Sequence, residues 1–231
     1  MKLDFLLKQK FVNKGVYNNK NVIENTLPAF DLAIKGNFGI CFRVRCTKDN
    51  KVIVYDDENF ARLLKVKDSV ENVNYDDIAY LSSYHVPLLE EVLNFINDKT
   101  PVIINLASVY DKKVTKEIIT ILDKYHGRFA IVSNNSKTIS YFNKVRENYI
   151  LGEIVSKQKP SIYSLGNFIA HYMIKTDFKS VNIKHYNSSE LLNFKKLEVP
   201  LIGYLITDQR QLNSYNDYFD NIVVDGNIFN I

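Results

Sequence analysis

The stretch GICFRVRCTKDNKVIVYDDE, residues 39–58, predicts two strands joined by a polar turn. Side chains alternate between the two faces of a strand. One face of strand 39–46 is apolar and consists of Ile40, Phe42, Val44 and Cys46. The opposite face carries Cys41, Arg43 and Arg45. Because buried arginines need partners, this second face is a candidate functional site.

Strands and helices alternate outward from this stretch along the chain. Helices are predicted at 25–36 (capped by Asn25 or Thr26), 75–82, 88–97, 112–125, 136–147, 164–175, 188–196 and 208–217. Strands are predicted at 10–12, 39–46, 51–55, 101–107, 129–133, 149–155, 180–183, 200–207 and 221–225. Apolar strands followed by helices indicate a parallel sheet covered by helices. Roughly eight such strands favour a single α/β domain over residues 1–231, a (β/α)₈ TIM barrel.

Composition and charge exclude several classes of function. The net charge of +4 is spread along the 231 residues without a basic run, so nucleic acid is not expected as a partner. The two cysteines, Cys41 and Cys46, point to opposite faces of one strand and are not expected to pair. No apolar run is long enough to span a membrane, and we expect a soluble, cytoplasmic protein.

In TIM barrels, functional residues lie at the carboxyl ends of the strands. The positions to inspect are therefore Asn13, Lys14, Cys41, Arg43, Arg45, Tyr55, Asp56, Asn105, Ala107, Ser133, Glu153, Asn182, Tyr204, Thr207 and Asp225.

Several segments resemble the glycerophosphodiester phosphodiesterase family of TIM barrels. They are VNKGVYNNKNVIENTLPAF (12–30), CFRVRCTKDNKVIVYDDENFARLL (41–64), VPLLEEVLNFI (86–96), TPVIINLAS (100–108) and NIVVDG (221–226). The resemblance implies a barrel that binds a divalent metal and hydrolyses glycerophospho-alcohols to glycerol 3-phosphate and an alcohol. In the family, two histidines act as general acid and base, and three carboxylates hold the metal.

Every one of these functional positions differs in this chain. By the resemblance, the two histidines correspond to Asn13 and Tyr55, and the arginine beside the first corresponds to Lys14. The metal ligands correspond to Cys41, Arg43 and Asn105, and a phosphate-facing lysine corresponds to Ala107.

These replacements predict a non-catalytic protein without a metal cofactor. An asparagine cannot transfer a proton near neutral pH, and each lost proton-transfer step typically removes about 10²- to 10⁴-fold in rate. Tyr55 would need its pKa strongly lowered from its usual value. A thiol and a guanidinium are poor ligands for Mg²⁺ or Ca²⁺. A divalent ion ~4 Å from Arg43 would be repelled by roughly 8 kcal/mol at an effective dielectric constant near 20.

The sequence leaves three hypotheses open. The first is a pseudoenzyme that binds a phosphate-containing or other anionic ligand, or a protein partner. Its ligand-binding candidates are Lys14, Arg43, Arg45 and Tyr204, with Tyr55 and Tyr204 forming an apolar wall. The second is an active hydrolase with a rearranged site, in which His85 is not expected to take part.

The third hypothesis is a structural or interaction protein with a plugged pocket. Its arginines would pair with local acids such as Asp56, Asp57 or Glu24. Asp56 and Arg62 are also expected to form a local ion pair or to cap a loop.

Overall fold

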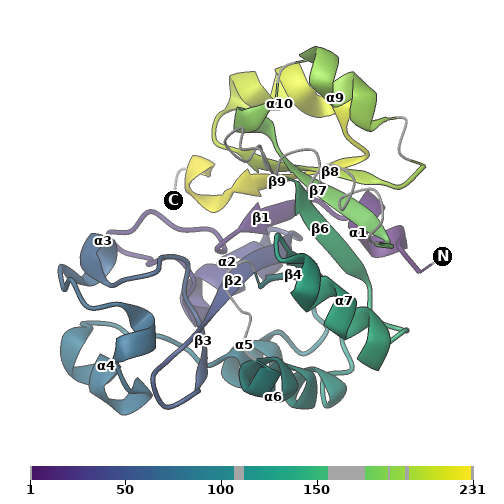
Figure 1. Ribbon diagram of the computed structural model, residues 1–231. Coiled ribbons are helices and arrows are strands. Elements are labelled where there is room, and N and C mark those ends of the chain that lie inside the picture. Colours follow the sequence, from purple (N-terminus) through teal and green to yellow (C-terminus); the bar gives the residue numbers. More distant parts are fainter. Residues whose placement is uncertain (1, 107–111, 156–174, 187, 196–197, 230–231) are drawn as a thin grey trace, which may run out of the picture.

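The computed structural model describes residues 2–106, 112–155, 175–186, 188–195 and 198–229. Within these ranges, parallel strands form a closed ring in the order β1-β2-β4-β5-β6-β7-β8-β9, and β9 pairs again with β1 (Figure 1). The ring strands are β1 (Phe11–Asn13), β2 (Gly39–Cys46), β4 (Val102–Asn105), β5 (Phe129–Ser133), β6 (Leu151–Val155), β7 (Phe178–Asn182), β8 (Leu201–Ile206) and β9 (Asn221–Asp225). The predicted eight-stranded barrel is confirmed.

Strand β3 (Val52–Val54) lies outside this ring. It pairs antiparallel with the end of β2, with Val44 opposite Val54. A short polar turn joins the two strands, in which the Thr47 hydroxyl donates to the Asp49 carboxylate at 2.6 Å. Such a turn is too short for the crossover that two parallel strands require. The expectation that 51–55 continues the parallel sheet is therefore wrong, although the predicted hairpin is confirmed.

The helices occupy the predicted segments, with ends that differ by a few residues. Two short helices, α1 (Asp4–Lys8) and α3 (Ala61–Leu64), were not predicted. The others are α2 (Leu27–Lys35), α4 (Tyr75–Leu81), α5 (Leu89–Ile96), α6 (Lys112–Asp123), α7 (Ser136–Val145), α9 (Ser188–Phe194) and α10 (Gln209–Tyr215). Of the predicted helix 164–175, residues 164–174 lie outside the described residues.

The two faces of β2 pack as their alternation predicts. Ile40, Phe42 and Val44 are fully buried in the layer between the ring and its helices. Cys41 faces the barrel interior, in a cluster with Phe11 and other residues of the inner wall. The arginine-bearing face of β2 therefore belongs to the inside of the barrel.

Among the described helices, none has the length and apolar character needed to cross a lipid bilayer.

Candidate functional site at the carboxyl ends of the strands

The strand register brings four of the predicted positions together at one end of the barrel. Asn13 on β1 lies opposite Cys41 on β2, and Arg43 on β2 lies opposite Asn105 on β4. Asn13, Cys41 and Asn105 are all at most 3% exposed. These side chains therefore surround the carboxyl end of the barrel interior, as the sequence predicts.

The turn after β1 holds Lys14 in a fixed place. The Lys14 amide donates to the Cys41 carbonyl at 2.7 Å, and the Lys14 carbonyl accepts from the Asn25 amide at 2.9 Å. Gly15 follows with φ of +78°, and a Cβ atom there would lie 2.6 Å from the Ala29 carbonyl carbon of α2. Only glycine fits this position without strain, so the sequence fixes the direction in which the chain leaves Lys14.

Asp56 lies between the basic side chains of this site. Its carboxylate is 3.0 Å from the Lys14 ammonium and 3.4 Å from Nη1 of Arg43. Its main-chain carbonyl accepts hydrogen bonds from Nη1 of Arg43 at 3.2 Å and from Nε and Nη2 of Arg45 at 3.2 and 2.7 Å. Burial opposes ionisation of Asp56, but the charges of Arg43 and Lys14 outweigh it and lower the pKa of this carboxyl group.

Arg45 is committed mainly to holding Asp56. Its side chain is 8% exposed, and its Nη1 lies 3.9 Å from the carboxylate of Glu58, which is 80% exposed. Burial is the main cause that lowers the pKa of the Arg45 guanidinium. Arg45 therefore holds the main chain of Asp56 in place through two hydrogen bonds to its carbonyl.

A second buried carboxylate, that of Glu24, joins the same network. Its side chain is 1% exposed and lies 3.2 Å from the Lys14 ammonium. It also accepts from Nη1 of Arg62 at 2.9 Å and from Nδ2 of Asn19 at 2.8 Å. Burial raises the pKa of Glu24, but hydrogen bonding to Arg62 and the charge of Lys14 outweigh this and lower it. Glu24 therefore remains ionised beneath the site.

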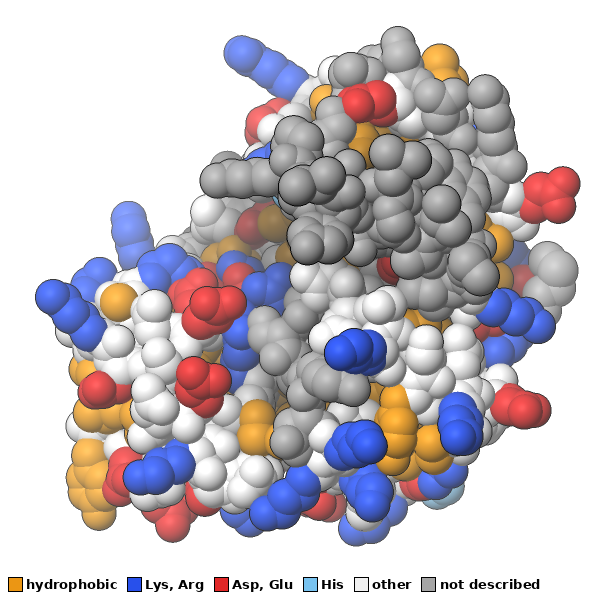
Figure 2. Space-filling model, in the orientation of Figure 1, with side chains coloured by type: hydrophobic (Ala, Val, Ile, Leu, Met, Phe, Trp, Pro, Cys, Tyr) orange, Lys and Arg blue, Asp and Glu red, His pale blue; other side chains and the backbone are white. Residues whose placement is uncertain are grey.

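Arg62 does not pair with Asp56 as expected from the sequence. Its guanidinium binds Glu24, and its Nε donates to the Asp57 carboxylate at 2.7 Å. Asp56 instead points toward Lys14 and Arg43. Figure 2 shows acidic and basic side chains side by side in the region between α3 and the end of β1.

Two buried hydrogen-bond donors of the site lack an acceptor among the described residues. They are Nδ2 of Asn13 and Nε of Arg43. An unsatisfied buried donor typically costs about 1–3 kcal/mol, so both groups favour an acceptor at this place. Asn13 and Arg43 lie on neighbouring strands, at the mouth of the barrel.

The two tyrosines predicted to form one wall belong to separate apolar clusters. Tyr204 packs in the barrel interior, where it lines an enclosed cavity of about 10 Å³ with Cys41 and Asn105. Tyr55 instead packs against Phe60, with ring centroids 5.2 Å apart, in a cluster outside the ring. The expected shared wall is therefore wrong, because β3 directs Tyr55 away from the barrel interior.

Comparisons with known proteins identify the family. Residues 18–228 match the model of the Glycerophosphoryl diester phosphodiesterase family. The chain belongs to this family. It is 28% identical over 148 residues to a glycerophosphodiester phosphodiesterase of Bacillus altitudinis, a match that covers 52% of this chain and 60% of that protein.

Solved structures of low sequence identity share the fold. A glycerophosphodiester phosphodiesterase from Thermotoga maritima is 18% identical, with a TM-score of 0.73 and coverage of 95% of this chain and 96% of that one. A phosphodiesterase from Oleispira antarctica, in complex with the product sn-glycerol-3-phosphate, is 14% identical, with a TM-score of 0.74 and coverage of 96% and 94%. The barrel is thus shared across the family at low identity.

His85 is paired with a glutamate of α5. His85 lies before α5, with a 60% exposed side chain 3.0 Å from the Glu91 carboxylate. Nowhere in the described ranges do three or more His, Cys, Asp or Glu side chains form a group that could hold a metal ion. Ala107, which the resemblance predicts at the position of the family's lysine, lies outside the described residues.

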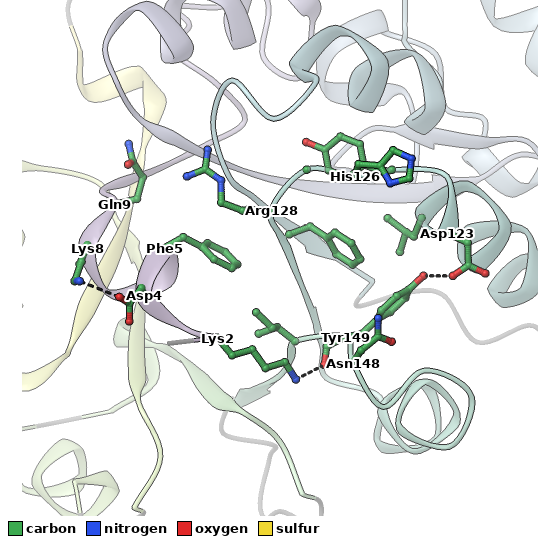
Figure 3. A pocket seen from close by; sticks show the side chains of 15 residues that line it. Lys2, Asp4, Phe5, Lys8, Gln9, Asp123, His126, Arg128, Asn148 and Tyr149 are labelled. Atoms are coloured by element: carbon green, nitrogen blue, oxygen red, sulfur yellow. Dashed lines mark hydrogen bonds and ion pairs between the residues drawn. The ribbon is translucent and has the colours of Figure 1, made fainter.

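A larger hollow, of about 770 Å³, lies at the opposite end of the barrel (Figure 3). It is lined by α1 and by the segments that lead into β5 and β6. Its charged side chains are already paired, for example Lys8 with Asp4 at 2.9 Å and Arg128 with Asp98 at 2.9 Å. This hollow shares no residue with the site at the carboxyl ends of the strands.

Proposed function

We propose that this member of the glycerophosphodiester phosphodiesterase family is non-catalytic and binds a phosphate-containing or other small anionic ligand at the barrel mouth. The observation that supports it best is the set of hydrogen-bond donors on β1, on β2 and in the turn after β1. Lys14 and Arg43 supply two cationic groups that meet at one carboxylate. Nδ2 of Asn13 and Nε of Arg43 are buried donors without an acceptor in the described part of the chain. Charge-assisted bonds to phosphate oxygens would satisfy these groups.

The residues at the positions of the catalytic histidines support the absence of acid–base catalysis. Asn13 has no group that titrates near neutral pH. Burial raises the pKa of Tyr55 above its already high usual value, so its phenol is a weaker acid than in water. A general acid or base works best with a pKa near the working pH. Neither residue meets this condition.

The residues at the metal-ligand positions do not fit Mg²⁺ or Ca²⁺. Burial raises the pKa of the Cys41 thiol to about 12, so it stays protonated at neutral pH. Arg43 brings a positive charge to the place where the family has a carboxylate. Hard cations bind several oxygen ligands, usually including carboxylates. We therefore propose that the family's metal is absent and that the Arg43 guanidinium takes its place as the partner of an anion.

The ion pairs of Asp56 and Glu24 favour a second candidate function. In it, the same network plugs the pocket, and the barrel serves only as a structural or interaction protein for a protein partner. The measurement that separates the two candidates is the melting temperature in inorganic phosphate or sn-glycerol 3-phosphate, because binding to the native state raises it. A rise at millimolar ligand supports the anion site, and an unchanged melting temperature supports the plugged pocket.

Incubation with glycerophosphocholine and Mg²⁺, Ca²⁺ or Mn²⁺ tests the absence of catalysis. We expect no release of glycerol 3-phosphate above a buffer control, because both proton-transfer groups are missing. Release of glycerol 3-phosphate by the wild-type protein, but not by Arg43→Ala, would contradict the proposal. It would favour an active hydrolase with a rearranged site.

We also propose that the protein is cytoplasmic. Cys41 and Cys46 are both free thiols, which is the usual state of cysteines in a reducing compartment.

A further inference from the structure

We infer that the Asp56 carboxylate is a tethered anion that an external phosphate must displace from Lys14 and Arg43, and that these two cations then prefer a phosphate monoester to a phosphodiester. This inference rests on the anion-binding function proposed above and adds the chemical class of the ligand. Asp56 thus becomes the residue that limits the affinity of a site whose donors come from Lys14 and Arg43.

The carboxylate already occupies the place where two oxygens of a phosphate would bind. Oδ2 of Asp56 lies 3.0 Å from the Lys14 ammonium, and Oδ1 lies 3.4 Å from Nη1 of Arg43. The carboxylate therefore bridges both cations with its two oxygen atoms. An external anion that reaches the same cations competes with it directly.

The main chain of Asp56 is held independently of its side chain. The carbonyl accepts one hydrogen bond from Arg43 and two from Arg45, at 2.7 to 3.2 Å. The Asp56 side chain is 19% exposed, so one edge of it reaches solvent. Rotation about its side-chain torsions can thus release the carboxylate toward water while the backbone and both arginines stay in place.

The charge of the ligand decides whether this exchange is favourable. A phosphate monoester carries about −1.5 to −2 at pH 7, with three acceptor oxygens. A phosphodiester carries a single charge, like the carboxylate that it would replace, and has two unesterified oxygens. The monoester therefore gains attraction to Lys14 and Arg43 and has a further oxygen for the donors of Asn13 and Arg43 that lack acceptors.

The other charged groups around Asp56 do not remove this preference. Glu24 stays paired with Lys14 and Arg62, and Asp57 stays paired with Arg62. Glu58 is 80% exposed and reaches only Arg45, at 3.9 Å. Asp56 is thus the carboxylate in contact with both Lys14 and Arg43 within the described network.

The test is calorimetric titration of sn-glycerol 3-phosphate and of glycerophosphocholine into the wild-type protein, Asp56→Asn and Asp57→Asn. We expect the wild type to bind the monoester at least about tenfold more tightly than the diester, since one charge-assisted bond accounts for such a factor. Asp56→Asn should tighten binding of both ligands by a similar factor, about tenfold, and keep the preference for the monoester, because displacing the carboxylate costs the same for either ligand. Asp57→Asn removes the same charge one residue away, where it contacts Arg62 instead, and should change neither affinity by more than about twofold.

The outcomes separate the inference from the function on which it rests. If the wild type binds the monoester and Asp56→Asn binds it equally or more weakly, the inference is wrong and the anion site stands. If Asp56→Asn binds both ligands and the wild type binds neither, the carboxylate closes the pocket of the native protein, and both the inference and the proposed function are wrong. If neither protein binds, both proposals fail. Circular dichroism and melting curves establish that each variant is folded.

Discussion

Arg43→Ala is expected to weaken binding of sn-glycerol 3-phosphate by roughly ten- to a hundredfold, the contribution of hydrogen bonds to a charged group. The guanidinium supplies Nη1, which now bonds Asp56, and the buried Nε, which lacks an acceptor in the described part of the chain. Calorimetry at constant ionic strength measures the change.

Arg128→Ala is the matched control for this variant. Arg128 is also an ion-paired arginine, but it lines the hollow at the opposite end of the barrel. Its removal lowers the net charge equally and should leave the affinity within about twofold, because exposed pairs contribute little and distant charges are screened. Equal losses of affinity in Arg43→Ala and Arg128→Ala would show that binding depends on the overall charge of the protein and not on a site at Arg43.

Restoring the family's residues is expected to create a divalent-metal site. The variant combines Asn13→His, Cys41→Glu, Arg43→Asp, Tyr55→His and Asn105→Glu. Asn13, Cys41, Arg43 and Asn105 lie on adjoining strands at the same end of the barrel, so the new carboxylates at 41, 43 and 105 would converge. Carboxylate clusters of this kind bind Mg²⁺ or Ca²⁺. Titration of each metal into the folded variant measures the effect.

The control is the same variant with Arg43 retained. A guanidinium ~4 Å from the metal would repel it by roughly 8 kcal/mol at an effective dielectric constant near 20, so no binding is expected. Absence of binding in the folded five-residue variant would show that the correspondence with the family motif is wrong at one or more of these positions.

The barrel could be predicted because its strands are apolar and alternate regularly with helices. The alternation of β2 also placed Phe42 against the helices and Arg43 inside, as the structure has them. Strand β3 was counted among the barrel strands, with Tyr55 and Asp56 as positions at its carboxyl end. Only the short turn before it determines that it folds back antiparallel.

Which residues meet at the site could be predicted more readily than which of them form ion pairs. Positions on neighbouring parallel strands meet by register alone, and for this reason Asn13, Cys41 and Arg43 were found together. The pair between Glu24 and Arg62 joins residues 38 positions apart. This pair depends on the position of α3, which carries Arg62. The helix is too short to show a clear hydrophobic periodicity in the sequence. Glu24 and Arg62 lie in the two segments that resemble the family, 12–30 and 41–64, and this was the available signal for the pair.

The central claim is that a fixed cation replaces the family's metal as the partner of phosphate. Its most direct test is the affinity for sn-glycerol 3-phosphate in EDTA and in millimolar Mg²⁺ or Ca²⁺. We predict the same dissociation constant in both conditions, because Lys14 and Arg43 hold the anion without a metal ion. Binding that appears only when the divalent ion is present would contradict the claim.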